Sequence, residues 1–280
     1  MRELRTCPVT GRVVLLNDHW VDAPAAPVAA REAGVPEEPC WYCTYAGPVI
    51  ARMGDITVAP HPVPALGIEG DPRPTVVAGA TRRQGVGAHE LVFGLHKGRG
   101  EGPLLAAVAA RVTDLRGDQR LRGFGASRRA APGAHAAWQL FAMPTDLETS
   151  LPAGWRDAER AHGERILEDG GATTLLAWAP RVPFEVWVLP AQGHARFDRS
   201  GPEVIAAVAA AVDRAFAQLS VAVRGAPIDL VLVESEPWRV ELLPRLAGPT
   251  AVEVATGVPV HGVFPEAAAH YLRDARRVTR

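Results

Sequence analysis

Apolar residues recur along the chain with two spacings, and these predict helices and strands in alternation. Stripes at helical spacing run through residues 103–115 and 202–219, and we expect two further helices at 155–168 and 265–275. Residues 23–38 and most of 71–84 are polar or rich in Pro and are expected to form loops. Short apolar or alternating runs predict strands at 12–16, 56–59, 75–77, 89–94, 138–143, 173–178, 184–189, 229–233 and 238–243.

One short pattern occurs twice. Trp138 to Pro144 and Trp238 to Pro244 both run from Trp to Pro in seven residues, and each follows strands and a long helix. The repetition predicts two copies of one α+β unit, residues 1–150 and 151–280. The expected fold class is therefore α+β, with antiparallel sheets and packed helices in each half.

Composition narrows the class of protein. The 280 residues are 48% hydrophobic and 22% charged, which are ordinary globular values. A net charge of −1 predicts binding neither to nucleic acid nor to an acidic membrane surface. No apolar run approaches the roughly 20 residues of a membrane span, and residues 1–6 are charged, unlike a signal peptide. We expect a cytoplasmic protein without membrane partners.

The three cysteines are Cys7, Cys40 and Cys43, too few for a disulfide framework. Two of them form a Cys-x-x-Cys pair, which indicates either half of a metal site or a redox pair. A redox pair requires a helix that opens at the first cysteine. Pro36, Pro39 and the turn residues that follow favour a loop, and hence a metal knuckle.

Several segments, taken in order, resemble galactose-1-phosphate uridylyltransferase, a duplicated member of the histidine-triad superfamily. The resemblance covers nearly the whole chain. It rests on Cys7-Pro-Val-Thr-Gly, on the Cys40–Cys43 pair, on Val58-Ala-Pro-His-Pro-Val-Pro-Ala-Leu66, on Pro183-Phe-Glu-Val-Trp-Val-Leu-Pro190 and on Trp238-Arg-Val-Glu-Leu-Leu-Pro-Arg-Leu246. It implies two histidine-triad-like halves, and the homodimer common in that family.

The resemblance also implies a zinc ion. The family's ligands are the two knuckle cysteines, a His after a strand of the first half, and the first His of a His-x-His-x-Gln motif. These positions fall here on Cys40, Cys43, His96 and His135. Two thiolates and two imidazoles would form a closed, structural zinc site. His89 competes with His96 for the third position.

The family's nucleophile is absent from the position where the motif places it. The second His of the motif attacks the α-phosphorus of a nucleotide sugar, and here that position is Ala137, which has no nucleophile. Beside it, Trp138 stands where the family has a small residue. His61 replaces an Asn expected near the nucleotide, and Arg239 replaces the His of a Trp-His-Ile-Glu motif.

Three interpretations follow. The first is an enzyme acting on a nucleotide-like or phosphorylated small molecule without a nucleotidyl-histidine intermediate, with zinc-centred catalysis as a variant. The second is a non-catalytic protein that binds a nucleotide or sugar phosphate. The third is an ordinary uridylyltransferase, which the lack of another His near residue 137 disfavours. The candidate catalytic residues are Gln139, Arg239 and Glu241, and the candidate substrate-binding residues are His61, Trp138 and Arg181, with Arg128 and Arg129 as further phosphate-binding candidates.

Overall fold

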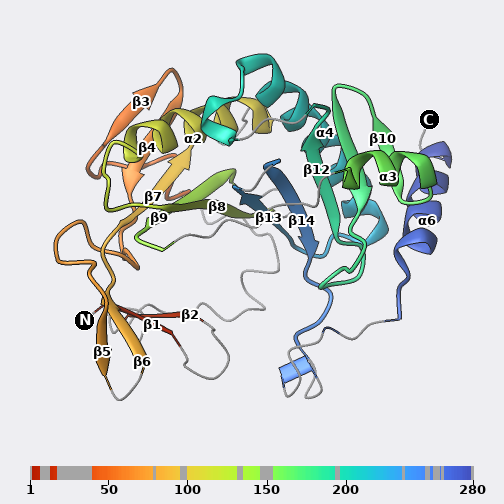
Figure 1. Ribbon diagram of the computed structural model, residues 1–280. Helices are drawn as coiled ribbons and strands as arrows, with labels where there is room; N and C mark the ends of the chain where they lie inside the picture. Colours follow the sequence, from red (N-terminus) through yellow and green to blue (C-terminus); the bar gives the residue numbers. More distant parts are fainter. Residues whose placement is uncertain are drawn as a thin grey trace.

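The computed structural model describes residues 2–6, 13–17, 40–77, 80–94, 100–130, 135–145, 154–192, 196–234, 237–249, 253–254, 259 and 262–278. Its elements form two antiparallel sheets with helices packed against the larger one (Figure 1). This confirms the α+β class.

The larger sheet has ten strands, in the order β10-β11-β12-β14-β13-β8-β9-β7-β4-β3. Its first-half strands are β3 (Ala51–Met53), β4 (Ile56–Pro60), β7 (Ala88–Phe93), β8 (Gly123–Ala130) and β9 (Ala137–Met143). Its second-half strands are β10 (Ile166–Asp169), β11 (Ala172–Leu176), β12 (Val186–Pro190), β13 (Ile228–Val233) and β14 (Arg239–Pro244).

The strand order is the same on both sides of the central β8–β13 pair. Outward from the pair it reads β8-β9-β7-β4-β3 on one side and β13-β14-β12-β11-β10 on the other. In each half a long helix joins the third strand in chain order to the fourth. These helices are α2 (Glu101–Leu115) and α4 (Pro202–Ala222).

The smaller sheet has the order β2-β1-β6-β5 and lies at one end of the molecule (Figure 1). It consists of β1 (Arg2–Thr6), β2 (Val13–Asn17), β5 (Thr75–Val77) and β6 (Ala80–Gln84). Further helical elements among the described residues are α3 (Trp155–His162), the short 3-10 helix η2 (Phe197–Arg199) and α6 (Pro265–Val278).

The core lies between one face of the large sheet and the helices α2, α4 and α6. Successive side chains of a strand point to opposite faces, so Trp138, Leu140 and Ala142 of β9 point to the helices and are fully buried. The opposite face carries Ala137, Gln139 and Phe141. This second face, called the open face below because these helices pack on the other side, holds most of the candidate site residues.

One expectation about helices needs correction. The helix expected over 155–168 ends at His162, because Gly163 adopts a left-handed conformation with φ 68° and caps it. Residues 166–169 instead pair with β11 as β10. By length and composition alone α4 could cross a membrane, since it has 21 residues and a mean hydropathy of 1.6 over its most apolar part. Ile205, Val208 and Val212 of α4 are buried in the core.

Candidate metal centre and ligand pocket

Three of the four predicted zinc ligands lie together. Cys40 and Cys43 belong to a turn that precedes β3, and His135 directly precedes β9. The Nδ1 atom of His135 lies 3.4 Å from Sγ of Cys40 and 3.8 Å from Sγ of Cys43. A tetrahedral zinc ion with bonds of about 2.3 Å to sulfur and about 2.1 Å to nitrogen separates such atoms by about 3.6 Å. The three side chains therefore fit zinc.

The second nitrogen of His135 is also placed as a zinc ligand requires. Nε2 lies 2.7 Å from the carbonyl oxygen of Gly94, to which it donates a hydrogen bond. This bond fixes the proton on Nε2 and leaves the lone pair of Nδ1 for a metal, an arrangement typical of metal-bound histidines. The ring of Tyr42 stacks on His135 with centroids 4.7 Å apart, and Phe93 packs beside both.

The two candidates for the third ligand have different outcomes. His96 lies outside the described residues, so its role stays a prediction. His89 is on β7 and does not belong to the cluster of Cys40, Cys43 and His135. Its Nδ1 accepts a hydrogen bond from the backbone N–H of Ala65 at 3.0 Å, and its Nε2 donates to Gln139 Oε1 at 3.3 Å.

His89 is the middle ring of a three-ring stack on the open face. Its centroid lies 3.9 Å from that of His61 and 4.2 Å from that of Phe141, with nearly parallel planes. Burial, and to a smaller extent the neighbouring His61, lower the pKa of His89 to about 3 against the opposing effect of Gln139. Burial also lowers the pKa of His61. Both imidazoles are therefore neutral at pH 7.

Because His89 is neutral in the folded protein, we predict that the free energy of unfolding falls in mild acid. Its pKa is about 3 in the folded protein and about 6.5 in the unfolded chain, so between these values the unfolded chain binds the extra proton. The free energy of unfolding is expected to fall by up to about 1.4 kcal/mol per pH unit below pH 6.5 through this group. Urea denaturation at pH 7 and pH 5 measures it. The variant His89→Gln keeps the metal ligands and should lose less free energy of unfolding between pH 7 and pH 5. An equal loss in the parent and the variant would contradict the low pKa of His89.

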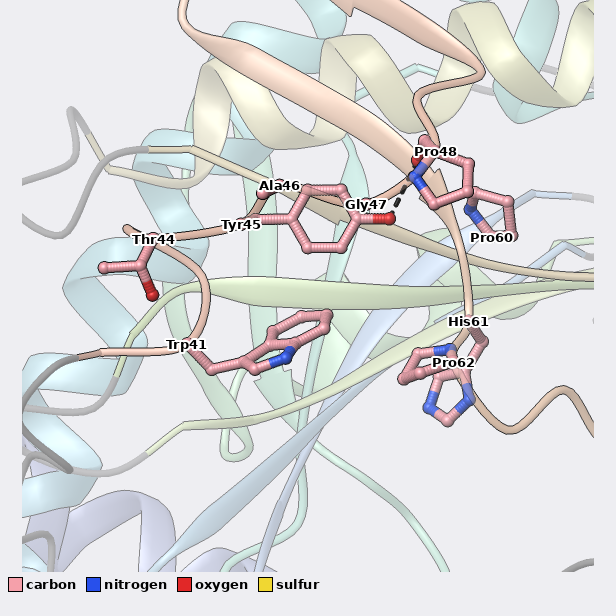
Figure 2. A pocket seen from close by; sticks show the side chains of 9 residues that line it. All are labelled: Trp41, Thr44, Tyr45, Ala46, Gly47, Pro48, Pro60, His61 and Pro62. Atoms are coloured by element: carbon pink, nitrogen blue, oxygen red, sulfur yellow. Dashed lines mark hydrogen bonds between the residues drawn. The ribbon is translucent and has the colours of Figure 1, made fainter.

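A pocket of about 470 Å³ lies between the knuckle turn and the end of β4 (Figure 2). Figure 2 shows Trp41, Thr44 and Tyr45 on one side and Pro48, Pro60 and His61 on the other. The nine lining residues include no Arg, Lys, Asp or Glu. Aromatic and Pro walls with few polar groups suit an uncharged planar part of a ligand. Trp41 and Tyr45 were not predicted for this site, although aromatic residues beside the cysteine pair are a visible signal.

Ala137 lies between the metal cluster and Gln139 along the open face of β9. It pairs with Phe93 of β7 and packs against a small apolar cluster of Ala59, Leu91 and Phe93. Gln139, two residues further along β9, contacts His89 as described above. That Ala137 stands where the resembled family has its nucleophile stays a prediction.

The candidates Arg181, Arg239 and Glu241 meet in a separate network in the second half of the open face. Glu241 accepts hydrogen bonds from Nε of Arg239 at 2.7 Å and from Arg181. A residue that the sequence did not predict, Glu185, accepts from Arg181 at 2.7 Å and from the indole of Trp187 at 2.8 Å. The carboxylates of Glu185 and Glu241 are both 1% exposed.

The charges of this network balance, because two guanidinium groups face two carboxylates. Burial lowers the pKa of Arg181, but the bonds and charges of Glu185 and Glu241 outweigh this and raise it overall. Arg239 lies with its guanidinium 4.3 Å from the centre of the Trp187 ring. Both cations are therefore already paired within the protein, which reduces what they can offer a phosphate group.

The remaining candidates lie elsewhere. Trp138 is on the helix-packed face of β9, fully buried, with its indole N–H 2.8 Å from the carboxylate of Glu101. Arg128 pairs with the same carboxylate in the core. Arg129 forms an exposed ion pair with Asp229 at 2.9 Å. The structure thus separates Trp138 from Gln139 by the thickness of the sheet, and a ligand contact of Trp138 stays a prediction.

Comparison with known proteins gives the fold. No family model and no curated protein matches the sequence. Among solved structures, a uridylyltransferase is 18% identical, with a TM-score of 0.74 over 99% of both chains. An ADP-glucose phosphorylase from Arabidopsis thaliana with bound ADP-glucose is 18% identical, with a TM-score of 0.67 over 98% of both chains. A GalT-like protein from the same plant is 19% identical, with a TM-score of 0.66 over 98% of this chain and 99% of that one. This chain therefore has the fold that these uridylyltransferase, phosphorylase and GalT-like proteins share.

Proposed function

We propose that this chain is a diverged uridylyltransferase-like zinc protein that acts on a nucleotide-like or phosphorylated small molecule without a nucleotidyl-histidine intermediate. One observation carries the proposal. A cluster fit for zinc lies beside an aromatic pocket, while the position two residues beyond His135 on β9 holds only the methyl group of Ala137. The fold likeness to a protein with bound ADP-glucose supports the ligand class.

Zinc would be held by Cys40, Cys43, His135 and, from the resemblance, His96. When bound, it would supply a structural cross-link between the knuckle turn and the β7–β9 pair. The turn contributes Trp41 and Thr44 to the pocket, so the metal would also hold one pocket wall in place. A closed site of four protein ligands would leave zinc-centred catalysis no open position.

We also propose that the two halves of the large sheet, residues 1–150 and 151–280, arose by duplication of a histidine-triad-like unit. The identical strand order on both sides of β8–β13 supports this. The cytoplasmic location and the homodimer remain part of the proposal.

A non-catalytic binding protein is the second candidate. It is favoured by the pairing of Arg181 and Arg239 with buried carboxylates, because such cations are poorly placed to stabilise charge on a transferring phosphoryl group. Turnover distinguishes the enzyme from the binding protein. With nucleotide sugars the binding protein would show a thermal shift but form no product.

Incubation with UDP-glucose and galactose 1-phosphate tests the missing nucleophile. We expect no uridylyl transfer and no nucleotidylated protein by intact mass spectrometry, because Ala137 cannot attack phosphorus. The variant Ala137→His is the matched comparison, since an adduct in the variant alone would assign the difference to this position. A nucleotidylated parent protein would refute the proposal. Absence of any thermal shift with UDP-glucose, ADP-glucose or sugar phosphates would argue against a phosphate ligand altogether.

A further inference from the structure

His61 is the only residue among those lining the pocket that has a basic side-chain atom. The other polar side chains on its walls have their hydroxyl groups engaged. Tyr45 donates its hydroxyl hydrogen to the carbonyl of Pro48 at 2.8 Å, and Thr44 donates to the carbonyl of Cys40 at 3.1 Å. The indole of Trp41 carries an N–H but no basic lone pair.

The contacts of His61 fix which of its nitrogens can accept a proton. Nδ1 lies 2.8 Å from the carbonyl oxygen of Val63. Two acceptors would repel at that distance, so Nδ1 carries the proton and donates it to this oxygen, although the N–H of Val63 also lies 3.2 Å from Nδ1. Nε2 is then the unprotonated nitrogen, and it has no hydrogen-bond partner among the described residues.

The plane of the ring is fixed as well. His61 stacks on His89 with centroids 3.9 Å apart and planes inclined by 11°, and His89 is held by Ala65, Gln139 and Phe141. Pro60 and Pro62 flank His61 in the chain and limit its backbone. An imidazole that lines a pocket, with one nitrogen bonded to a carbonyl and the other without a partner among the described residues, can act as a general base.

We propose that His61 is the catalytic base of this pocket and that its Nε2 accepts the proton of the attacking hydroxyl group. The proposal rests on the proposed function, because it requires a phosphorylated ligand. The oxygen of water or of a second substrate forms a bond to phosphorus as its proton passes to Nε2. The bond from phosphorus to the leaving oxygen breaks on the opposite side, the leaving phosphate departs with the electron pair, and the imidazolium then passes its proton to water. No nucleotidyl-enzyme forms, in agreement with Ala137.

The first test measures the reactivity of the imidazoles without any substrate. Diethyl pyrocarbonate acylates unprotonated, accessible imidazole nitrogens, and mass spectrometry of peptides locates the products. His270 is the matched internal reference, because its Nδ1 also pairs with a partner, Asp274, while its side chain is 75% exposed. We expect His61 to be acylated at a rate comparable with His270, His89 to stay unmodified, and the His61 product to be lost in His61→Asn. Full modification of His270 with His61 untouched would overturn the proposal.

The second test separates catalysis from binding. Hydrolysis of UDP-glucose and ADP-glucose, with and without galactose 1-phosphate as acceptor, is measured in the parent protein, in His61→Asn and in the surface control His270→Gln. We expect His61→Asn to lower kcat by about 10²–10⁴-fold while calorimetric binding of the nucleotide sugar persists, and His270→Gln to resemble the parent.

The outcomes distinguish the two proposals. Binding of a nucleotide sugar without turnover by the parent overturns the catalytic role of His61 and leaves the ligand class intact. Binding of none of these compounds refutes the proposed function and, because the catalytic role of His61 rests on it, that role as well.

Discussion

Replacement of Arg239 by Met is expected to lower the free energy of unfolding by about 3–5 kcal/mol. The guanidinium is one of two that neutralise the buried carboxylates of Glu185 and Glu241. Its removal leaves two buried negative charges to share Arg181, whose side chain is 52% exposed. Met keeps an apolar stem against Trp187, so the loss reports mainly the unpaired charge. Urea denaturation at pH 7 measures it.

A double variant provides the control for this effect. Arg239→Met combined with Glu241→Leu removes the charge together with its partner, and Arg181 retains Glu185. Replacement of a whole buried ion pair by apolar residues is often nearly neutral, so the double variant should recover most of the stability lost in the single one. A single variant that loses less than about 1 kcal/mol would behave like an exposed ion pair and would contradict the burial of this network.

Replacement of His135 by Ala is expected to reduce zinc affinity by more than about 100-fold. Loss of an outer partner of a ligand already costs 10–100-fold, and loss of the ligand itself costs more. The protein purified without chelator should contain about one zinc ion per chain, and His135→Ala much less. Elemental analysis and a chelator competition measure both quantities. Because metal binding couples to folding, the variant should also melt at a lower temperature.

The sequence offers a matched control for the metal site. Cys7→Ser removes the third cysteine, which the resemblance does not assign to zinc, and should leave the zinc content unchanged. Cys43→Ser should behave like His135→Ala, because the two residues belong to the same cluster. Equal zinc content in all three variants would contradict the three-ligand cluster.

The hydrophobic pattern predicted most elements of the large sheet but missed the strand at its centre. β4, β7, β9 and both long helices lie within two or three residues of their predicted bounds. β8, with the sequence Gly-Phe-Gly-Ala-Ser-Arg-Arg-Ala, has neither the branched residues nor the clean alternation that indicate a strand. It forms because Gly125–Ala130 pair with the whole of β13, Ile228–Val233, which is distant in sequence. Local patterns carry no information on such partners.

The candidate site shows the same division between local and distant information. Cys40, Cys43 and His135 could be named because the family resemblance assigned a metal to these positions, and the structure brings them together. The hydrogen bond from His135 to Gly94, the stack on His89 and the pairing of Arg181 with Glu185 depend on which strands are neighbours. The sequence therefore indicated which residues could bind a ligand. It did not show that Arg181 and Arg239 are paired with the buried carboxylates of Glu185 and Glu241.

The central β8–β13 pair has a consequence for assembly. Together with the contacts of α2 with α4 and η2, it is the main connection between the two five-stranded halves among the described residues. If the halves separated, one would expose the edge of β8 and the other the edge of β13. Each edge is a row of unpaired N–H and C=O groups that is complementary to the other edge. Two molecules opened in this way could pair each β8 with the β13 of the other and form an exchanged dimer. Refolding at high protein concentration should therefore favour exchange over closure within one molecule.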